Sequence, residues 1–171
     1  MAGFERQFVG VWELQDWKVT NLSTQDVTPY YGGRERGYII YTADGWVSSS
    51  IVDTGRPVNT NDREARLDLV EALNQNGSAG LSDEQYEILT PFALSALGYL
   101  GYCGPYTADA THVHHEVRSA GRPSHMGLVL TRSYHFQDDT LKLSGDAFGF
   151  RDTLLWKRIT PHPDAGVFHA D

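Results

Sequence analysis

Cysteine is nearly absent from this sequence, because Cys103 is the only one in 171 residues. A single thiol excludes an internal disulfide and a cysteine-based zinc or iron–sulfur site. Long apolar runs are also missing, and no stretch reaches the roughly 18 residues of a membrane-spanning helix. The first ten residues, MAGFERQFVG, lack the basic and apolar regions of a secretory signal. We therefore expect a cytoplasmic protein with no membrane partner.

Positive charge is scarce as well. Lysine and arginine together number 14 against 22 acidic residues, which gives a net charge of −8. Without a basic stripe to neutralise phosphates, a nucleic-acid partner is not expected. Aromatic side chains and glycine are plentiful, with nine Tyr, seven Phe, four Trp and 17 Gly. This combination favours a β-rich domain with tight turns.

Alternating side chains predict strands at both ends of the chain. Residues 8–22 alternate with Trp12, Leu14, Asp16 and Lys18 on one face. Residues 38–52 predict a β-hairpin, because two β-prone runs flank Asp44-Gly45, a dipeptide that tolerates a tight turn. Strands resume after Gly104 and continue to about residue 158.

The middle of the chain changes to helical spacing. Ser82 and Gln85 have the spacing of a capping box, and Thr90-Pro91 predicts that a new helix starts there. An apolar stripe in this region predicts packing of the helix against the sheet; it comprises Phe92, Ser95, Ala96, Tyr99 and Leu100. We predict a single mainly β domain over residues 1–171, an antiparallel barrel with its core at about 8–158 and a short helical insertion at about 62–101.

Three histidines lie close together in the segment THVHHEV. Strand alternation sends His112 and His114 to one face, where Glu116 and Arg118 also lie, and this face should meet solvent. A His-x-His pair can ligate zinc or iron, but no third ligand follows at a suitable spacing, so no metal is expected. His115 points to the opposite, more apolar face. It is either a core histidine with satisfied hydrogen bonds or an acid/base that faces a ligand.

Other polar residues share faces with apolar ones. Arg132 and Tyr134 alternate with Leu128 and Leu130, and Asp16 shares its face with Trp12. Buried unpaired charges are costly, so such groups either pair inside the barrel or reach solvent. A ligand cavity with a few oriented polar groups produces this pattern.

Several motifs together resemble one known family. FVGVWELQDW, GYIIYTADGWVSSSI, YLGYCGPYTAD with THVHHEV, and the closing LLWKR occur in the order and spacing of the lipocalin-like domain proteins. These are small intracellular β-barrels of bacteria and fungal biosynthetic clusters. The resemblance implies that Trp12 closes one end of the barrel with Arg158 stacked against it. It also implies a hydrophobic small-molecule ligand.

The function that follows is a cofactor-independent cyclase, isomerase or dehydratase acting on a bulky polyketide- or terpenoid-like intermediate. Such reactions need proton transfer and conformational restraint, which a shaped cavity supplies. The expected catalytic set is His115 as acid/base, Arg132 and Tyr134 as stabilisers of oxyanion charge, and Asp16 as an orienting group. The expected substrate-binding walls are Trp12, Tyr41, Trp46, Tyr99, Leu130 and Phe148.

Two other functions remain open. A carrier of a hydrophobic metabolite would use the same polar groups only to orient its ligand, and a structural or interaction module would have a filled barrel. The sequence leaves the oligomeric state undetermined, with a homodimer as one option.

Overall fold

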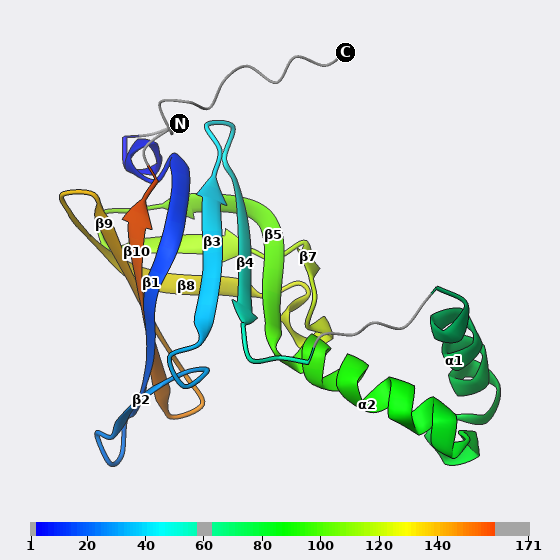
Figure 1. The fold of residues 1–171 in the computed structure, drawn as a ribbon. Helices are drawn as coiled ribbons and strands as arrows, with labels where there is room; N and C mark the ends of the chain where they lie inside the picture. Colours follow the sequence, from blue (N-terminus) through cyan, green and yellow to red (C-terminus); the bar gives the residue numbers. More distant parts are fainter. Residues whose placement is uncertain (1–2, 58–62, 160–171) are drawn as a thin grey trace.

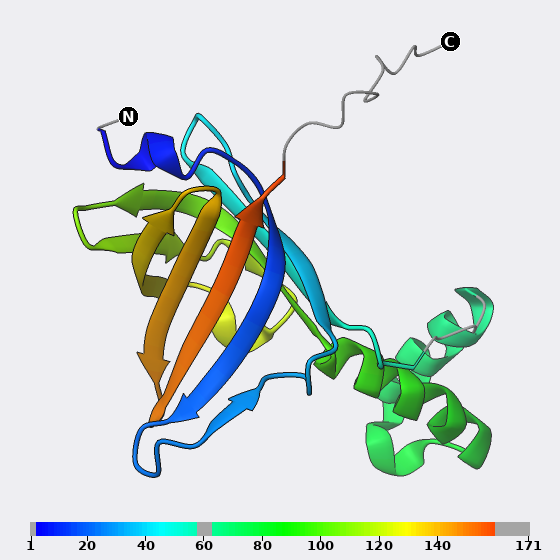
Figure 2. The same ribbon diagram turned by 60° about the vertical axis from the view of Figure 1, so that its left-hand side comes forward.

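A computed structural model describes residues 3–57 and 63–159 of the chain. Its centre is a closed antiparallel β-barrel (Figures 1 and 2). Eight strands form the ring, in which each pairs with the next and the last pairs again with the first. In ring order they are β1 (Gly10–Asn21), β3 (Glu35–Tyr41), β4 (Trp46–Asp53), β5 (Tyr99–Ala108), β6 (His112–Glu116), β8 (Val129–Gln137), β9 (Thr140–Ala147) and β10 (Phe150–Arg158). The predicted mainly β barrel is confirmed.

Shorter elements lie at the margins of the ring. The short strand β2 (Val27–Pro29) pairs with β1, and β7 (Ser119–Ala120) pairs with β5. Turns of 3₁₀ helix precede β1 (η1, Glu5–Gln7) and β8 (η3, Pro123–His125). These pieces extend the barrel wall at its two ends.

The hairpin of β3 and β4 forms where the sequence predicts it. Gly45 adopts a φ of +88° in the turn, a conformation that glycine adopts without steric cost. Side chains of β3 alternate strictly between buried and exposed, with Ile39 and Tyr41 inside. The residues that fill the barrel interior on β3 are therefore those that the alternation of side chains predicts.

A β-bulge in β1 overturns the predicted faces of that strand. Pairing with β10 shifts between Leu14 and Asp16, so Gln15 is the extra residue. Beyond the bulge Trp17 is buried, while Asp16 forms an ion pair with Lys18 at 2.8 Å. Both charged side chains are substantially exposed. The prediction that Asp16 and Lys18 share the face of Trp12 is wrong, because one extra residue inverts the alternation.

The helical insertion consists of α1 (Arg63–Asn76), a 3₁₀ turn η2 (Ser78–Gly80) and α2 (Asp83–Leu97). The capping box of Ser82 and Gln85 is confirmed at the start of α2. Pro91 does not start a new helix as predicted, because it lies inside α2. A proline removes one backbone N–H donor from the helix, and this exposed helix tolerates that loss. The insertion ends near Gly98, and residues 99–101 already belong to β5. Its predicted start at residue 62 lies outside the described residues.

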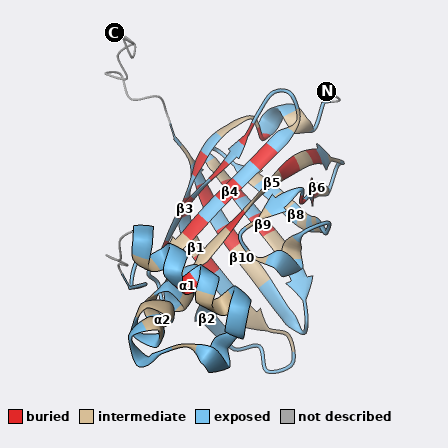
Figure 3. Ribbon diagram, turned by 90° about the vertical axis from the view of Figure 1, so that its right-hand side faces the viewer, coloured by how far each residue is buried: buried red, intermediate tan, exposed pale blue. Residues whose placement is uncertain are grey.

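The helices do not pack on the sheet as predicted. Figures 1 and 2 show that α1 and α2 project away from the barrel, and Figure 3 shows them mostly exposed, with some residues of intermediate burial. No residue of α2 is buried, and Phe92 is half exposed. The physical reason is closure, because the apolar face of the sheet is already inside the barrel. No helix in the described part of the chain has the length and apolarity that a membrane crossing requires.

One end of the barrel is closed by Trp12 and Arg158. The guanidinium carbon of Arg158 lies 4.0 Å from the Trp12 ring centroid, and the two residues face each other across β1 and β10. The Trp12 indole N–H donates to the Phe8 carbonyl at 2.8 Å, and the Arg158 guanidinium donates to the carbonyls of Val9 and Gln7. This confirms the predicted pair.

We expect Trp12→Ala to lower the free energy of unfolding by roughly 3–5 kcal/mol, because it empties a fully buried site in this plug. Urea denaturation measures the change. Trp46→Ala is the matched control, since Trp46 is 46% exposed on β4, and its expected effect is below about 0.5 kcal/mol. Similar losses in both variants would contradict a special role for the closed end.

Candidate functional site

The barrel encloses a cavity of about 380 Å³. Phe148, in the turn between β9 and β10, is fully exposed and yet borders the cavity, so the cavity reaches the surface at that end. We call this end the mouth; it lies opposite the plug of Trp12 and Arg158. The lining is mostly apolar and includes Trp17, Ile39, Ile51, Leu100, Leu128, Leu130, Leu143, Leu154 and Trp156.

Polar side chains also face this cavity. They come from the barrel wall, from the segment between β2 and β3, and from the segment that joins β7 to β8. They are Tyr30, Ser49, Tyr102, His115, Arg122, Ser124, His125, Arg132 and Asp152.

His115 is held from both sides in the wall of the cavity. Its side chain is fully buried; Tyr41 Oη lies 3.0 Å from Nε2 and Tyr102 Oη lies 2.8 Å from Nδ1. The buried Tyr41 hydroxyl has no other hydrogen-bond partner in the described residues, so it donates to Nε2. Nδ1 therefore carries the proton and donates to Tyr102. Hydrogen-bond satisfaction fixes the tautomer.

The surroundings keep this imidazole neutral. Burial, together with the nearby positive charge of Arg132, lowers the pKa of His115 to about 3. Burial raises the pKa of Tyr102 to about 12, against an opposing effect of Arg132. Near neutral pH the phenol keeps its proton. Its oxygen also forms a hydrogen bond with the side chain of Ser49, which borders the cavity too. Tyr102 and Ser49 are therefore two linked hydroxyls in the cavity wall, and between them they can donate a hydrogen bond to a ligand.

Arg132 is the cation closest to these groups. Its guanidinium lies against Gly145 of β9, where a Cβ would stand 2.6 Å from Nη1, so the absent side chain makes room for it. Its one hydrogen bond among the described residues goes to the Thr131 carbonyl at 3.2 Å. No carboxylate in the described residues forms an ion pair with it. Its charge is left facing the cavity.

Aromatic rings surround a second guanidinium at the mouth. Tyr30 stacks on Trp17 at 3.8 Å between centroids, and Arg122 donates to the hydroxyls of Tyr30 and Tyr31 at 3.2 Å each. The Trp17 indole N–H donates to Asp152 at 2.8 Å. Strand β1, the segment after β2 and the segment after β7 are thereby tied together.

His125 follows Arg122 on the same segment. Its Nδ1 is buried and has no hydrogen-bond partner. Burial and the charges of Arg122 and Arg132 lower its pKa, so the ring is neutral near pH 7. A neutral imidazole with one unsatisfied nitrogen beside a cavity is a ready partner for a ligand.

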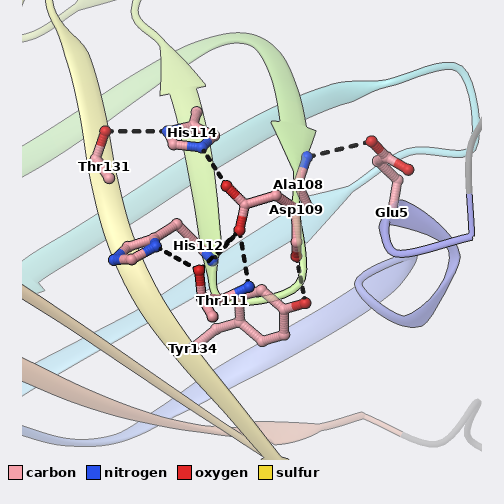
Figure 4. A network of polar contacts seen from close by, with 8 residues as sticks. All are labelled: Glu5, Ala108, Asp109, Thr111, His112, His114, Thr131 and Tyr134. Atoms are coloured by element: carbon pink, nitrogen blue, oxygen red, sulfur yellow. Dashed lines mark hydrogen bonds and ion pairs between the residues drawn. The ribbon is translucent and has the colours of Figure 1, made fainter.

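His112 and His114 lie on the outer face of the barrel, in a separate network (Figure 4). His114 contacts Thr131 at 3.0 Å and Asp109 at 3.3 Å, and His112 contacts Thr111 at 2.8 Å. Backbone hydrogen bonds from Thr111 and His112 hold the pKa of Asp109 far below its usual range. The described residues contain no group of three or more potential ligands that could hold a metal.

The predicted site residues fall into two groups. His115, Arg132, Leu130 and Phe148 border the cavity, and Tyr41 stands directly behind His115.

The others lie elsewhere. Trp12 is in the plug, and Tyr134 donates its hydroxyl to the Asp109 carbonyl at 2.7 Å. Asp16 and Trp46 are on the outer surface, and Tyr99 borders a groove against α2. For Asp16 the cause is the bulge in β1. For Tyr99 it is the early start of β5.

Sequence reasoning missed Tyr102, Arg122 and His125. Tyr102 was missed because residues 99–101 were predicted to end the helical insertion, whereas they begin β5. The tyrosines of Tyr-Leu-Gly-Tyr-Cys-Gly-Pro-Tyr favour a strand, but its glycines and proline weaken that signal. Arg122 and His125 lie in a connection, where periodicity carries no information about side-chain direction. The one sequence feature that could have pointed to them is the segment Arg-Pro-Ser-His, which places a cationic residue and a histidine in a loop between two glycines.

Comparison with known proteins places the chain in a family. The model of the lipocalin-like domain matches residues 9–159. The chain belongs to the lipocalin-like domain family. No curated protein matches it.

Solved structures resemble this lipocalin-like domain only distantly. Fatty-acid-binding protein 1 of Echinococcus granulosus has 11% identity and a TM-score of 0.39, over 91% of this chain and 99% of that one. A variant of the fluorescent protein UnaG has 10% identity and a TM-score of 0.38, over 90% and 96%. These scores assign no ligand to the chain.

The neutral His115 predicts a pH dependence of stability. Its folded pKa of about 3 lies below the ordinary 6.5, so between these values the unfolded chain binds a proton that the folded chain excludes. This contribution weakens the fold as pH falls, by about 1.4 kcal/mol for each pH unit well below 6.5. Urea unfolding between about pH 7 and pH 4 measures it.

The comparison that isolates this contribution is the difference between the parent protein and His115→Gln. That difference should shrink towards low pH, while His135→Gln, altered at an exposed position of β8, should follow the parent curve. A difference that stays constant with pH would show that His115 is not held neutral.

Proposed function

We propose that this lipocalin-like domain binds a bulky, mostly apolar small molecule inside its barrel and holds an oxygen atom of that molecule against Tyr102 and Arg132. The observation that carries the proposal is the linked hydroxyls of Tyr102 and Ser49 near the guanidinium of Arg132, which has no carboxylate partner among the described residues, in a mostly apolar cavity. Ligand sites typically combine an apolar lining with a few polar groups that set orientation. The expected cellular setting is the cytoplasm.

We further propose that the bound molecule is transformed without a cofactor, as an isomerase, cyclase or dehydratase of secondary metabolism would do. Proton shifts and ring closures of carbonyl compounds develop negative charge on oxygen. Arg132 and the Tyr102 hydroxyl can stabilise that charge, and the apolar lining strengthens the interaction by excluding water. The cavity wall also restrains the flexible body of the substrate.

The role of His115 differs from the acid/base function expected from the sequence. Both of its nitrogens are engaged and its pKa is about 3, so it is poorly suited to take a proton from a ligand. We propose that it is a positioning residue. By donating Nδ1–H to Tyr102, it turns the phenol proton away from the imidazole, towards Ser49 or a ligand.

A non-catalytic carrier is the second candidate. It is favoured by the same engagement of His115, which leaves no strong base beside Tyr102. In that case Tyr102 and Arg132 fix ligand orientation and nothing more. The two functions share one binding site and differ only in turnover.

Filling the cavity should strongly weaken ligand binding. We expect Leu130→Trp to weaken the binding of the neutral dye Nile red by about tenfold or more, because the indole occupies ligand space. Val129→Trp is the matched control, since Val129 is the preceding residue of β8 and is 58% exposed. Fluorescence titration measures affinity, and thermal unfolding verifies folding. Equal dye binding by both variants and the parent would refute binding inside the barrel.

Turnover separates the enzyme from the carrier. Small molecules that co-purify with the protein, identified by mass spectrometry, provide candidate substrates. We expect Tyr102→Phe to lower the rate of conversion by roughly 10²–10³-fold with binding largely retained, as for the loss of one oxyanion donor. Tyr38→Phe is the control, because Tyr38 is exposed on β3. Absence of conversion by the parent protein would favour the carrier.

A further inference from the structure

We propose that the ligand is an organic acid whose ionised carboxylate is held at the mouth by Arg122 and His125. The proposal rests on the ligand-binding function above and adds the chemical class of the ligand. Its apolar body would occupy the barrel, and its acid group would lie near the surface.

The charge of Arg122 is not neutralised by the protein. Its two hydrogen bonds go to the hydroxyls of Tyr30 and Tyr31, which are neutral acceptors. Burial raises the pKa of Tyr31, so that phenol keeps its proton. No carboxylate of the described residues lies within 4.0 Å of the guanidinium. The side chain is nevertheless half-buried and borders the cavity.

Outside the cavity, Arg36 and Arg158 donate to backbone carbonyls, and three other arginines form ion pairs. Arg34 pairs with Asp53, Arg118 with Glu116 and Arg151 with Asp146, at 2.9, 2.6 and 2.7 Å respectively. Carboxylates are abundant in this chain of net charge −8. Arg122 and Arg132 have no carboxylate partner among the described residues and both border the cavity, so their positive charge is available to a ligand.

His125 supplies an independent observation. The residue borders the same cavity, and its buried Nδ1 has no hydrogen-bond partner. Arg122 and Arg132 both act electrostatically on this ring, which places the three groups near one another. A turn of the neutral ring would present this nitrogen to a ligand oxygen as an N–H donor and so satisfy it.

The acidic side chains near the mouth do not cancel this charge. Asp152 borders the cavity and accepts from Trp17, and Glu35 is buried, accepts from the Tyr31 backbone N–H and does not border the cavity. Two guanidiniums thus face the cavity against one carboxylate. A planar carboxylate matches the forked donors of a guanidinium, and the apolar lining matches a hydrocarbon or aromatic body.

Displacement of Nile red by matched acid and ester pairs tests the proposal. The panel is dodecanoate, naphthalene-acetate and pyrene-butyrate, each with its methyl ester, at a pH near 8 where the acids are ionised. For at least one pair we expect the acid to bind about 10–100-fold more tightly than its ester, as a charge-assisted hydrogen bond would give.

Arg122→Gln should remove that preference by lowering the affinity for the acid, while the affinity for the ester stays within about twofold of the parent value. Arg122→Lys keeps the charge but loses the fork, so it should retain part of the preference. Arg118→Gln is the control on the outer surface, and it should leave the acid preference unchanged. A loss of acid and ester binding together in Arg122→Gln would mean that Arg122 only holds Tyr30 and Tyr31 in place, and would overturn the proposal.

The remaining outcomes separate the two proposals. If Nile red binds but no acid is preferred to its ester, the acid class is wrong and the binding function stands. If neither Nile red nor any member of the panel binds to the parent protein, both proposals fall.

Discussion

Closure of the sheet, through the pairing of β1 with β10, is the constraint on which the rest of the structure depends. Once the ring closes, its inner face is accessible only at the two ends of the barrel. The apolar side chains of the strands pack mainly against one another, with Phe8, Tyr30 and Tyr31 added from outside the ring, and the helical insertion has no apolar sheet face to cover. The helices therefore project from the barrel, and the cavity lies inside it (Figure 3).

The two ends of the barrel have different roles: the closed end stabilises the fold, and the mouth carries the polar groups proposed to bind the ligand. At the closed end, Trp12 and Arg158 fill the space and satisfy backbone carbonyls, so nothing is left for a ligand. At the mouth, Arg122 and His125 keep unmatched charge and an unpaired nitrogen. Unsatisfied polar groups cost stability, and they are retained where a binding partner can compensate for them.

Between these ends, His115 has both of its hydrogen bonds made within the protein, and it still affects the cavity through the residue that it orients. Its two nitrogens need one donor and one acceptor, and Tyr41 and Tyr102 supply them. Because Tyr41 is deeply buried, its proton must go to His115, and this choice is passed through the ring to Tyr102. Tyr41 thus determines that Tyr102 accepts a hydrogen bond from His115, and the phenol proton is left for Ser49 or a ligand.

The sequence alone determined what depends on local periodicity and turn chemistry. Alternation placed His115 opposite His112 and His114, Asp44-Gly45 located a hairpin, and the order of motifs indicated the barrel with its Trp12–Arg158 plug. Only the tertiary structure decided the rest. One bulge at Gln15 moved Asp16 outside and Trp17 inside, and chain closure brought Tyr30, Tyr31 and Arg122 together from distant segments. The physical reason is that a face is a property of one strand, whereas a site is set by strand register and by connections between strands, which periodicity does not encode.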